Sequence, residues 1–241
     1  MRNLISLTFV FLSIVVIGQP KEIDSTKKFS FGINFSPDYS YRRLHSDIDD
    51  GFVEIRNKIE SPRFGFTSGI VARYQLGSRF ALESGLQFSD KGDKYEVSIE
   101  DFILADGSSP EDDPAIHQKA TTSYHYYYLG IPLKLNYYVL QKGVNFFLSA
   151  GFSTDFYVGN ESKTTWEFSD RTETNTNQIE DEDFNKVNFT GLAGFGIETN
   201  ISKRLDFRFE PIFRYSFTQL VDAPLKVYLY SIGANFVIFY R

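Results

Sequence analysis

Eight segments of this 241-residue chain alternate large apolar residues with small or polar residues at a period of two. Successive side chains of a β-strand point to opposite faces, so this period predicts strands with one apolar face and one small or polar face. Helical periodicity is almost absent beyond the N-terminal run. The eight segments are residues 29–37, 64–76, 80–89, 124–138, 144–158, 187–199, 205–215 and 227–240.

The connections between these segments alternate between short and long. The short ones lie at 77–79, 141–143 and 200–203, the long ones at 38–63, 90–123 and 159–186, and a shorter polar stretch at 217–226 precedes the last segment. Even-stranded membrane barrels have this pattern. The sequence therefore predicts an all-β fold, an eight-stranded antiparallel up-and-down transmembrane β-barrel with long extracellular loops and short periplasmic turns. Weak alternation at 52–59, 95–104 and 163–168 predicts hairpins that extend above the membrane.

The aromatic content indicates which face of the strands meets lipid. The chain contains 25 Phe and 15 Tyr, and aromatic residues make up 17% of it. A soluble barrel turns its apolar face inward, but eight strands enclose only enough space for side chains to fill. Large rings from all eight strands exceed that space, so we expect them to face hydrocarbon while small polar residues line the interior.

Nine charged residues, five acids and four bases, fall on the predicted inner face. They are Arg73, Glu83, Lys134, Asp155, Glu198, Asp206, Arg208, Glu210 and Arg214. Ionisable groups inside a membrane protein are candidates for an ion or proton path. The near balance of signs favours the alternative, a structural network of paired charges that fills the interior.

The N-terminus predicts export. Arg2 precedes an apolar run over residues 4–17, and this run is shorter than the ~20 residues of a spanning helix. We therefore expect a cleaved signal peptide over 1–18, a short periplasmic segment over 19–28 and a barrel domain over 29–241. The chain has no cysteine, which excludes disulfides and thiolate sites. Its net charge of −6 argues against nucleic acid as a partner.

The fourth segment contains the string YLGIPLKLNY, residues 128–137. It resembles the YLEIPLLLKY-type signature of PorT-like outer-membrane β-barrel proteins of Bacteroidetes. The resemblance implies a barrel in the outer membrane and names no single function. The sequence departs from the pattern at Gly130, where the signature has Glu, and at Arg241, which follows the terminal aromatic residue. Pro132 lacks a backbone N–H, so we expect a bulge or local kink there.

Three histidines and one acidic run are the candidates for a catalytic or metal site. His45 and His117 lie in long connections, and His125 stands at the margin of a strand. Ser123 shares a strand face with His125, but residues two apart do so in any strand, so we expect no catalytic residue and no enzyme activity. The acidic run at 180–183 lacks the glycine and spacing of a calcium loop. We expect no metal and no cofactor.

These features favour a small non-enzymatic outer-membrane protein with a structural or surface-interaction role through its extracellular loops. The alternatives are a narrow pore or accessory component of an envelope transport or secretion system, and a soluble secreted ligand-binding barrel. The expected partners are outer-membrane lipid and lipopolysaccharide, the barrel-assembly machinery during insertion, and a surface or secretion-complex protein. A soluble barrel would require the aromatic face to point inward.

Overall fold

The computed structural model describes residues 28–46, 50–98, 119–179, 183–223 and 225–241. The predicted signal peptide lies outside these residues, as does all but the last residue of the predicted periplasmic segment.

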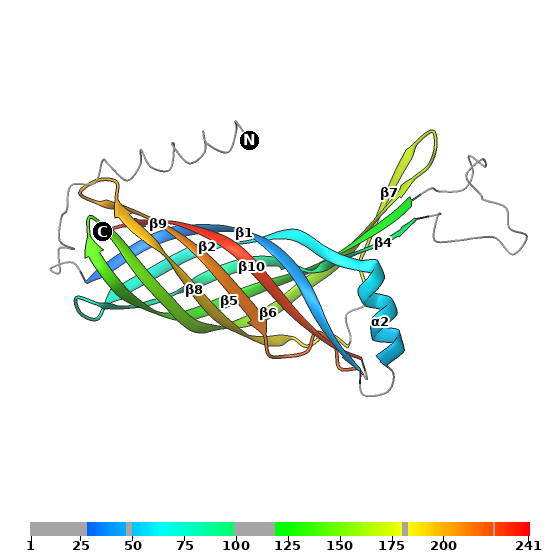
Figure 1. Cartoon of the computed structure of the whole chain (residues 1–241), viewed down its shortest axis with the longest axis horizontal. Helices are drawn as coiled ribbons and strands as arrows, with labels where there is room; N and C mark the ends of the chain where they lie inside the picture. Colours follow the sequence, from blue (N-terminus) through cyan, green and yellow to red (C-terminus); the bar gives the residue numbers. More distant parts are fainter. Residues whose placement is uncertain (1–27, 47–49, 99–118, 180–182, 224) are drawn as a thin grey trace, which may run out of the picture.

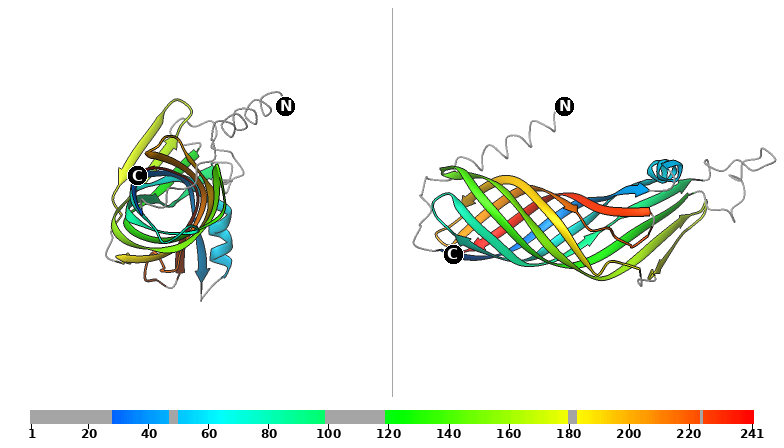
Figure 2. Two further views of the ribbon diagram at one scale, coloured as in Figure 1. Left: turned by 90° about the vertical axis from the view of Figure 1, so that its left-hand side faces the viewer. Right: turned by 90° about the horizontal axis from the view of Figure 1, so that it is seen from below.

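Eight long strands form a closed antiparallel ring. Each strand pairs with the next, and β10 returns to pair with β1, from Phe31 opposite Tyr240 to Ser46 opposite Leu225. The view along the axis shows the ring closed on itself (Figure 2). The predicted eight-stranded up-and-down barrel is confirmed. In order around the ring, the strands are β1 (Phe29–Ser46), β2 (Glu60–Gln75), β3 (Phe80–Lys91), β5 (Lys119–Lys142), β6 (Val144–Glu167), β8 (Val187–Asn200), β9 (Leu205–Ser216) and β10 (Leu225–Tyr240).

Short turns and long connections lie at opposite ends of the barrel, as the sequence predicts (Figure 1). The turns between β2 and β3, β5 and β6, and β8 and β9 share one end with the C-terminus, and we call this the turn end. The opposite end, the loop end, carries the helix α2 (Asp50–Ile59) and the two short strands β4 (Asp93–Ser98) and β7 (Thr172–Asn177).

The two short strands extend the barrel wall beyond the ring. β4 pairs with β2 and β5, and β7 pairs with β6. Gly92 separates β3 from β4 with a φ of 153°, and a Cβ at this position would collide with the backbone carbonyl of Tyr124. The pairing with β2 also shifts by one residue there, from Phe66 opposite Asp90 to Pro62 opposite Asp93. The predicted hairpin extensions are therefore present in the described parts of 95–104 and 163–168.

The third predicted extension, at 52–59, is wrong, because these residues form helix α2. The helix has an acidic residue at its start and basic residues in its last turn, which suits the helix dipole. Glu54 and Lys58 pair across one turn at 3.0 Å, and Arg56 forms an ion pair with Glu60, the first residue of β2. Opposite charges four residues apart, such as Glu54 and Lys58, are the sequence signal that predicts this helix. Among the described residues, no helix is long and apolar enough to span a membrane.

The outer surface of the ring is apolar and the interior is polar. Phe31 and Ile33 of β1 are 63% and 62% exposed, whereas Ser36 on the same strand is 0% exposed. The same alternation follows all eight strands. This orientation excludes the soluble ligand-binding barrel, which requires the rings inside.

A row of stacked rings crosses the outer wall near the loop end. Phe35, Phe66, Phe88 and Tyr127 follow one another around β1, β2, β3 and β5, with centroids 6.2, 5.9 and 5.8 Å apart. We call this row the aromatic belt. Girdles of aromatic residues are typical of the level where hydrocarbon meets headgroups.

The prediction of a bulge at Pro132 is wrong. The pairing of β5 with β6 passes through Pro132 opposite Ser153 without a shift, and its shifts lie at Tyr127/Tyr128 and Tyr138/Leu140. Pro132 instead interrupts only the ladder to β3, which resumes in the same register on both sides. The Ser84 hydroxyl donates to the Pro132 carbonyl at 2.7 Å across that interruption. One missing backbone donor is thus accommodated on one side of the strand.

Candidate functional site

The structure places all nine predicted inner charges in the barrel interior, each at most 5% exposed. Seven of them form one continuous chain of ion pairs near the turn end. In order along that chain they are Asp206, Arg73, Glu198, Arg208, Glu83, Lys134 and Glu210, with successive N to O distances of 3.0, 2.6, 2.8, 2.5, 3.0 and 2.7 Å. We call this chain the lumen network.

Aromatic rings hold the guanidinium groups of the lumen network in place. The Arg208 guanidinium lies 4.4 Å from the ring centroid of Phe147 and 4.9 Å from that of Phe239. The Arg73 guanidinium lies 4.1 Å over Phe239. Both arginines also donate to the Tyr138 hydroxyl, at 3.2 and 3.1 Å. Each cation is therefore bonded to carboxylates and packed on rings, which offsets the cost of its burial.

The other two predicted charges pair with residues that the sequence interpretation assigned to loops. Asp155 forms an ion pair with Lys91 at 2.7 Å, and Arg214 forms one with Asp38 at 2.7 Å. Lys91 and Asp38 each lie two residues beyond the last inward residue of their predicted strands. Continuing the alternation past the apparent strand ends would have found them.

The structure explains why Gly130 stands where the PorT-like signature has Glu. Position 130 faces the interior, and a Cβ there would lie 2.5 Å from Asp155 Oδ1 and 3.0 Å from Ser153 Oγ. The glutamate of the family signature would place a second carboxylate against Asp155. In this chain, Asp155 on β6 supplies the carboxylate and Gly130 on β5 leaves room for it.

The interior leaves little space. Two cavities among the inner side chains of the described residues measure about 10 Å³ each, which is close to the minimum that holds one water. Toward the loop end an apolar cluster closes the bore, a feature that the sequence interpretation missed. It joins Leu44, Tyr126, Tyr128, Val227 and Leu229 of the strands with Phe184 and Leu220 of the connections.

Charged residues fasten α2 to the loop end. Glu60 forms ion pairs with Arg42 of β1 and with Arg56 of α2, and Arg42 also donates to the Asn57 side chain at 3.2 Å. Asp93, at the start of β4, is 3% exposed. Burial raises the pKa of Asp93 to about 6, and the nearby Glu60 carboxylate adds to this rise.

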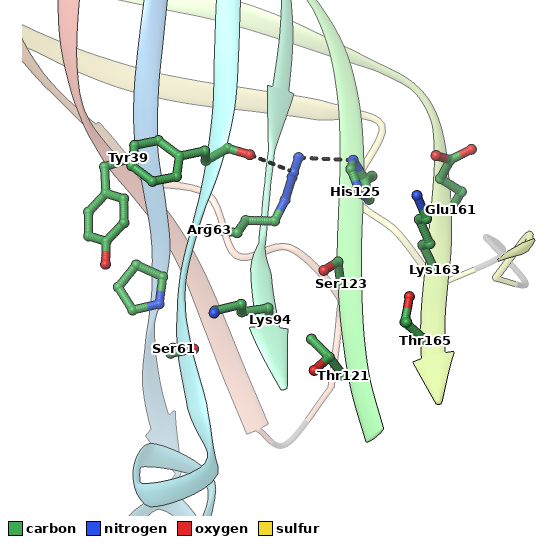
Figure 3. A pocket seen from close by; sticks show the side chains of 12 residues that line it. Tyr39, Ser61, Arg63, Lys94, Thr121, Ser123, His125, Glu161, Lys163 and Thr165 are labelled. Carbon is green, nitrogen blue, oxygen red and sulfur yellow. Dashed lines mark hydrogen bonds between the residues drawn. The ribbon is translucent and has the colours of Figure 1, made fainter. Parts of the chain in front are cut away.

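An open groove of about 630 Å³ lies on the outer wall above the aromatic belt (Figure 3). We call it the wall groove. Phe64 and Tyr39 border it, their rings 5.2 Å apart, and Lys94 and Lys163 line its far side. Side chains from β1, β2, β4, β5 and β6 thus meet at one place.

His125 is held at the base of the wall groove. Its Nδ1 lies 3.1 Å from Asp90 Oδ2 and 2.9 Å from the Arg63 guanidinium, and Arg63 also forms an ion pair with Asp90. Within the described part of the chain, no hydrogen bond joins His125 to Ser123, the pair considered above. His117 and residues 180–182 lie outside the described residues, and His45 lies on β1. The residues that the structure describes contain no group of three carboxylate or imidazole side chains placed to hold a metal ion.

A sequence model of the family described as "Outer membrane protein beta-barrel domain" matches residues 18–222. The chain belongs to this family. No curated protein sequence matches this outer-membrane barrel.

Solved structures of outer-membrane proteins are similar to the chain at low identity. Ail, the attachment invasion locus protein of Yersinia pestis, is 13% identical over 88% of this chain and 99% of Ail, with a TM-score of 0.37. Neisserial surface protein A is 11% identical over 87% and 96%, with a TM-score of 0.39. The N-terminal barrel domain of Pseudomonas aeruginosa OprF is 11% identical over 91% and 98%, with a TM-score of 0.31.

Membership of the outer-membrane family determines which end of the barrel faces the periplasm and which end faces the outside. Short turns of such barrels face the periplasm and long connections face the outside. The lumen network therefore lies toward the periplasm. The α2 helix, β4, β7 and the wall groove lie on the extracellular side.

Proposed function

We propose that this outer-membrane barrel is a non-enzymatic surface-interaction protein that acts through the ordered sheet above its aromatic belt. The observation that carries the proposal is the contrast between a filled interior and an extended exterior. β5 and β6 are each 24 residues long, whereas a tilted strand needs only ~9–11 residues to span the membrane. More than a third of each strand therefore projects beyond the bilayer.

The strand β7 is the most exposed part of this extension. All six of its residues, Thr172–Asn177, are exposed and polar, and it pairs on one side with β6. Its sequence contains three threonines, two asparagines and one glutamate. A polar edge strand can add hydrogen bonds to an extended segment of another molecule while its own side chains stay soluble. This supports a contact role for the β6–β7 hairpin.

The filled interior argues against the narrow pore. A conducting path would have to pass the lumen network and the apolar cluster near the loop end, and the two interior cavities are close to the smallest size that can hold one water. The role as an accessory of an envelope transport or secretion system stays a prediction, and so does the narrower PorT-like membership. A stable complex with envelope proteins would support it.

Two measurements test the proposed function. The first replaces residues 164–177 by a tight turn, which removes β7 and keeps Lys163, and compares binding of cells that display either form to a panel of glycans, matrix proteins and neighbouring cells. We expect the shortened form to fold, as judged by heat-modifiable migration in SDS gels, and to lose the binding that the full chain shows. Equal binding by both forms would contradict the proposal. The second is conductance in planar bilayers, where we expect no channel events.

A further inference from the structure

The wall groove contains a regular row of hydroxyl and ammonium groups. Ser61, Lys94, Ser123 and Lys163 lie opposite one another on β2, β4, β5 and β6. Adjacent strands are about 4.8 Å apart, so the backbones of the two lysines stand about 10 Å apart with Ser123 between them. Figure 3 shows Lys94 and Lys163 on either side of Ser123. Side chains of this length can converge on one anion between them.

Two of the acids near the groove are engaged by other groups. Asp90 is paired with Arg63, and Glu96 is bonded to Lys119 at 2.9 Å. Glu161 also lines the groove, opposite His125 on the neighbouring strand.

The two lysines of the wall groove lack a close carboxylate partner of this kind among the described residues. The Lys94 ammonium is 4.0 Å from the same Glu96. Lys163 forms no ion pair with any of the residues that the structure describes. The groove therefore presents two cations that a ligand can neutralise.

The height of the groove indicates a lipid headgroup. On β5, His125 and Ser123 stand two and four residues beyond Tyr127 of the aromatic belt. At ~3.3 Å per residue and a tilt of ~40°, they lie about 5 and 10 Å above the belt. This is the level of lipid headgroups. Ser123, about 10 Å above the belt, is within reach of a headgroup that is larger than a single phosphate ester. Phe64 is 78% exposed and stands two residues beyond Phe66 of the belt, at the lower edge of the groove. The belt rings below it face the acyl chains.

We propose that the wall groove binds the phosphorylated sugar headgroup of an outer-leaflet glycolipid. Lys94 and Lys163 bind the phosphate by charge-assisted hydrogen bonds. Ser61 and Ser123 can exchange hydrogen bonds with sugar hydroxyls, and Phe64 packs against the first acyl carbons. The site lies on the outside of the barrel and is separate from the β7 edge to which the surface role is assigned.

The experiment measures binding of diphosphoryl lipid A to the folded full chain in detergent micelles by native mass spectrometry. We expect the double variant K94A/K163A to bind at least tenfold more weakly than the wild type. Arg43→Ala is the matched control, because Arg43 is an exposed cation on β1 outside the groove. We expect it to bind as the wild type does. Heat-modifiable migration checks that each variant is folded.

Two further arms identify the ligand chemistry. Fully dephosphorylated lipid A should bind weakly to wild type and double variant alike. Inorganic phosphate at 10 mM should leave bound lipid A in place, because a free anion lacks the sugar and acyl contacts. Equal loss of binding with R43A, unchanged binding with K94A/K163A, or complete displacement by phosphate would each overturn the proposal.

Discussion

The Arg208 guanidinium donates two hydrogen bonds to one carboxylate oxygen of Glu198, from Nε at 3.0 Å and from a terminal nitrogen at 2.8 Å. The two residues face each other on β8 and β9, and both are at most 1% exposed. This pair is the centre of the lumen network. It joins the strands of one wall to Glu83 of the opposite wall, because Arg208 also bonds to Glu83.

Replacing Arg208 by methionine removes the cation and keeps most of the packing volume. Glu83 and Glu198 then lose a buried partner, so we expect the free energy of unfolding to fall by about 3–5 kcal/mol. Urea unfolding in lipid vesicles measures the change. Arg171→Met is the control, because Arg171 forms an exposed pair and its loss should change stability by less than about 0.5 kcal/mol. Similar losses for both variants would show that the network contributes no more than a surface pair.

The position of Gly130 predicts a compensating pair of substitutions. Gly130→Glu should destabilise the barrel by about 1–3 kcal/mol, because it places a second carboxylate beside Asp155. Adding Asp155→Gly should restore most of this loss, since the new carboxylate can then pair with Lys91. The coupling free energy from the double-mutant cycle measures the effect. A coupling near zero would contradict the assignment of both positions to one inner site.

Arg241 closes the periplasmic end of the barrel. Its guanidinium donates to Asp206 at 2.5 and 2.6 Å and to the Asn200 side chain at 2.5 Å. We expect Arg241→Ala to lower the free energy of unfolding by about 1–3 kcal/mol, because charge-assisted bonds to a buried carboxylate are lost. Lys203→Ala, in the exposed turn between β8 and β9, should have almost no effect. Equal stability of R241A and wild type would contradict this role.

The extracellular end should become more stable on acidification. The pKa of Asp93 rises from 3.8 to about 6 on folding, so the folded chain binds more protons between these values. The contribution of Asp93 to stability is therefore full below about pH 4 and is lost as the pH rises through 6. A shift of about two units corresponds to about 1–3 kcal/mol.

Asp93→Asn tests this pH dependence directly. We expect the variant to be more stable than the wild type at pH 7, and the difference to shrink toward pH 4. Other titrating groups cancel in the comparison of the two proteins. A difference that stays constant between pH 4 and pH 7 would show that Asp93 ionises normally in the folded chain.

The barrel and its inner charges could be predicted because alternation of period two reports directly which face a side chain occupies. Glu198 and Arg208 were assigned inward from sequence alone, and the structure places them there. Which charges would pair could not be predicted, since the partners of Arg208 lie on β3 and β8 and depend on the shear of the closed ring. The sequence also could not show that Phe147 and Phe239 would pack against that cation.

The features beyond the membrane were the least predictable. There, polar residues occupy both faces of the sheet, so the alternation of apolar and polar residues that predicts a strand is weak. Lys94 and Lys163 carry no sequence signal that relates them, and they come into one row only because β4 and β6 pair with β5 on either side. The helix α2 was missed for a related reason, because its place against the barrel depends on the ion pairs of Glu60 with Arg42 and Arg56.

The central claim is that the apolar face of the strands meets lipid while the polar face fills the interior. The chain has no cysteine, so single cysteines can be introduced at the exposed Phe152 and at Ser153, which is 5% exposed. After spin labelling and reconstitution in vesicles, the label at 152 should be accessible to oxygen dissolved in the bilayer and protected from a water-soluble nickel chelate. Position 153 should react poorly or carry a label accessible to neither. Access of the nickel chelate to the label at 152, with oxygen access at 153, would contradict the account.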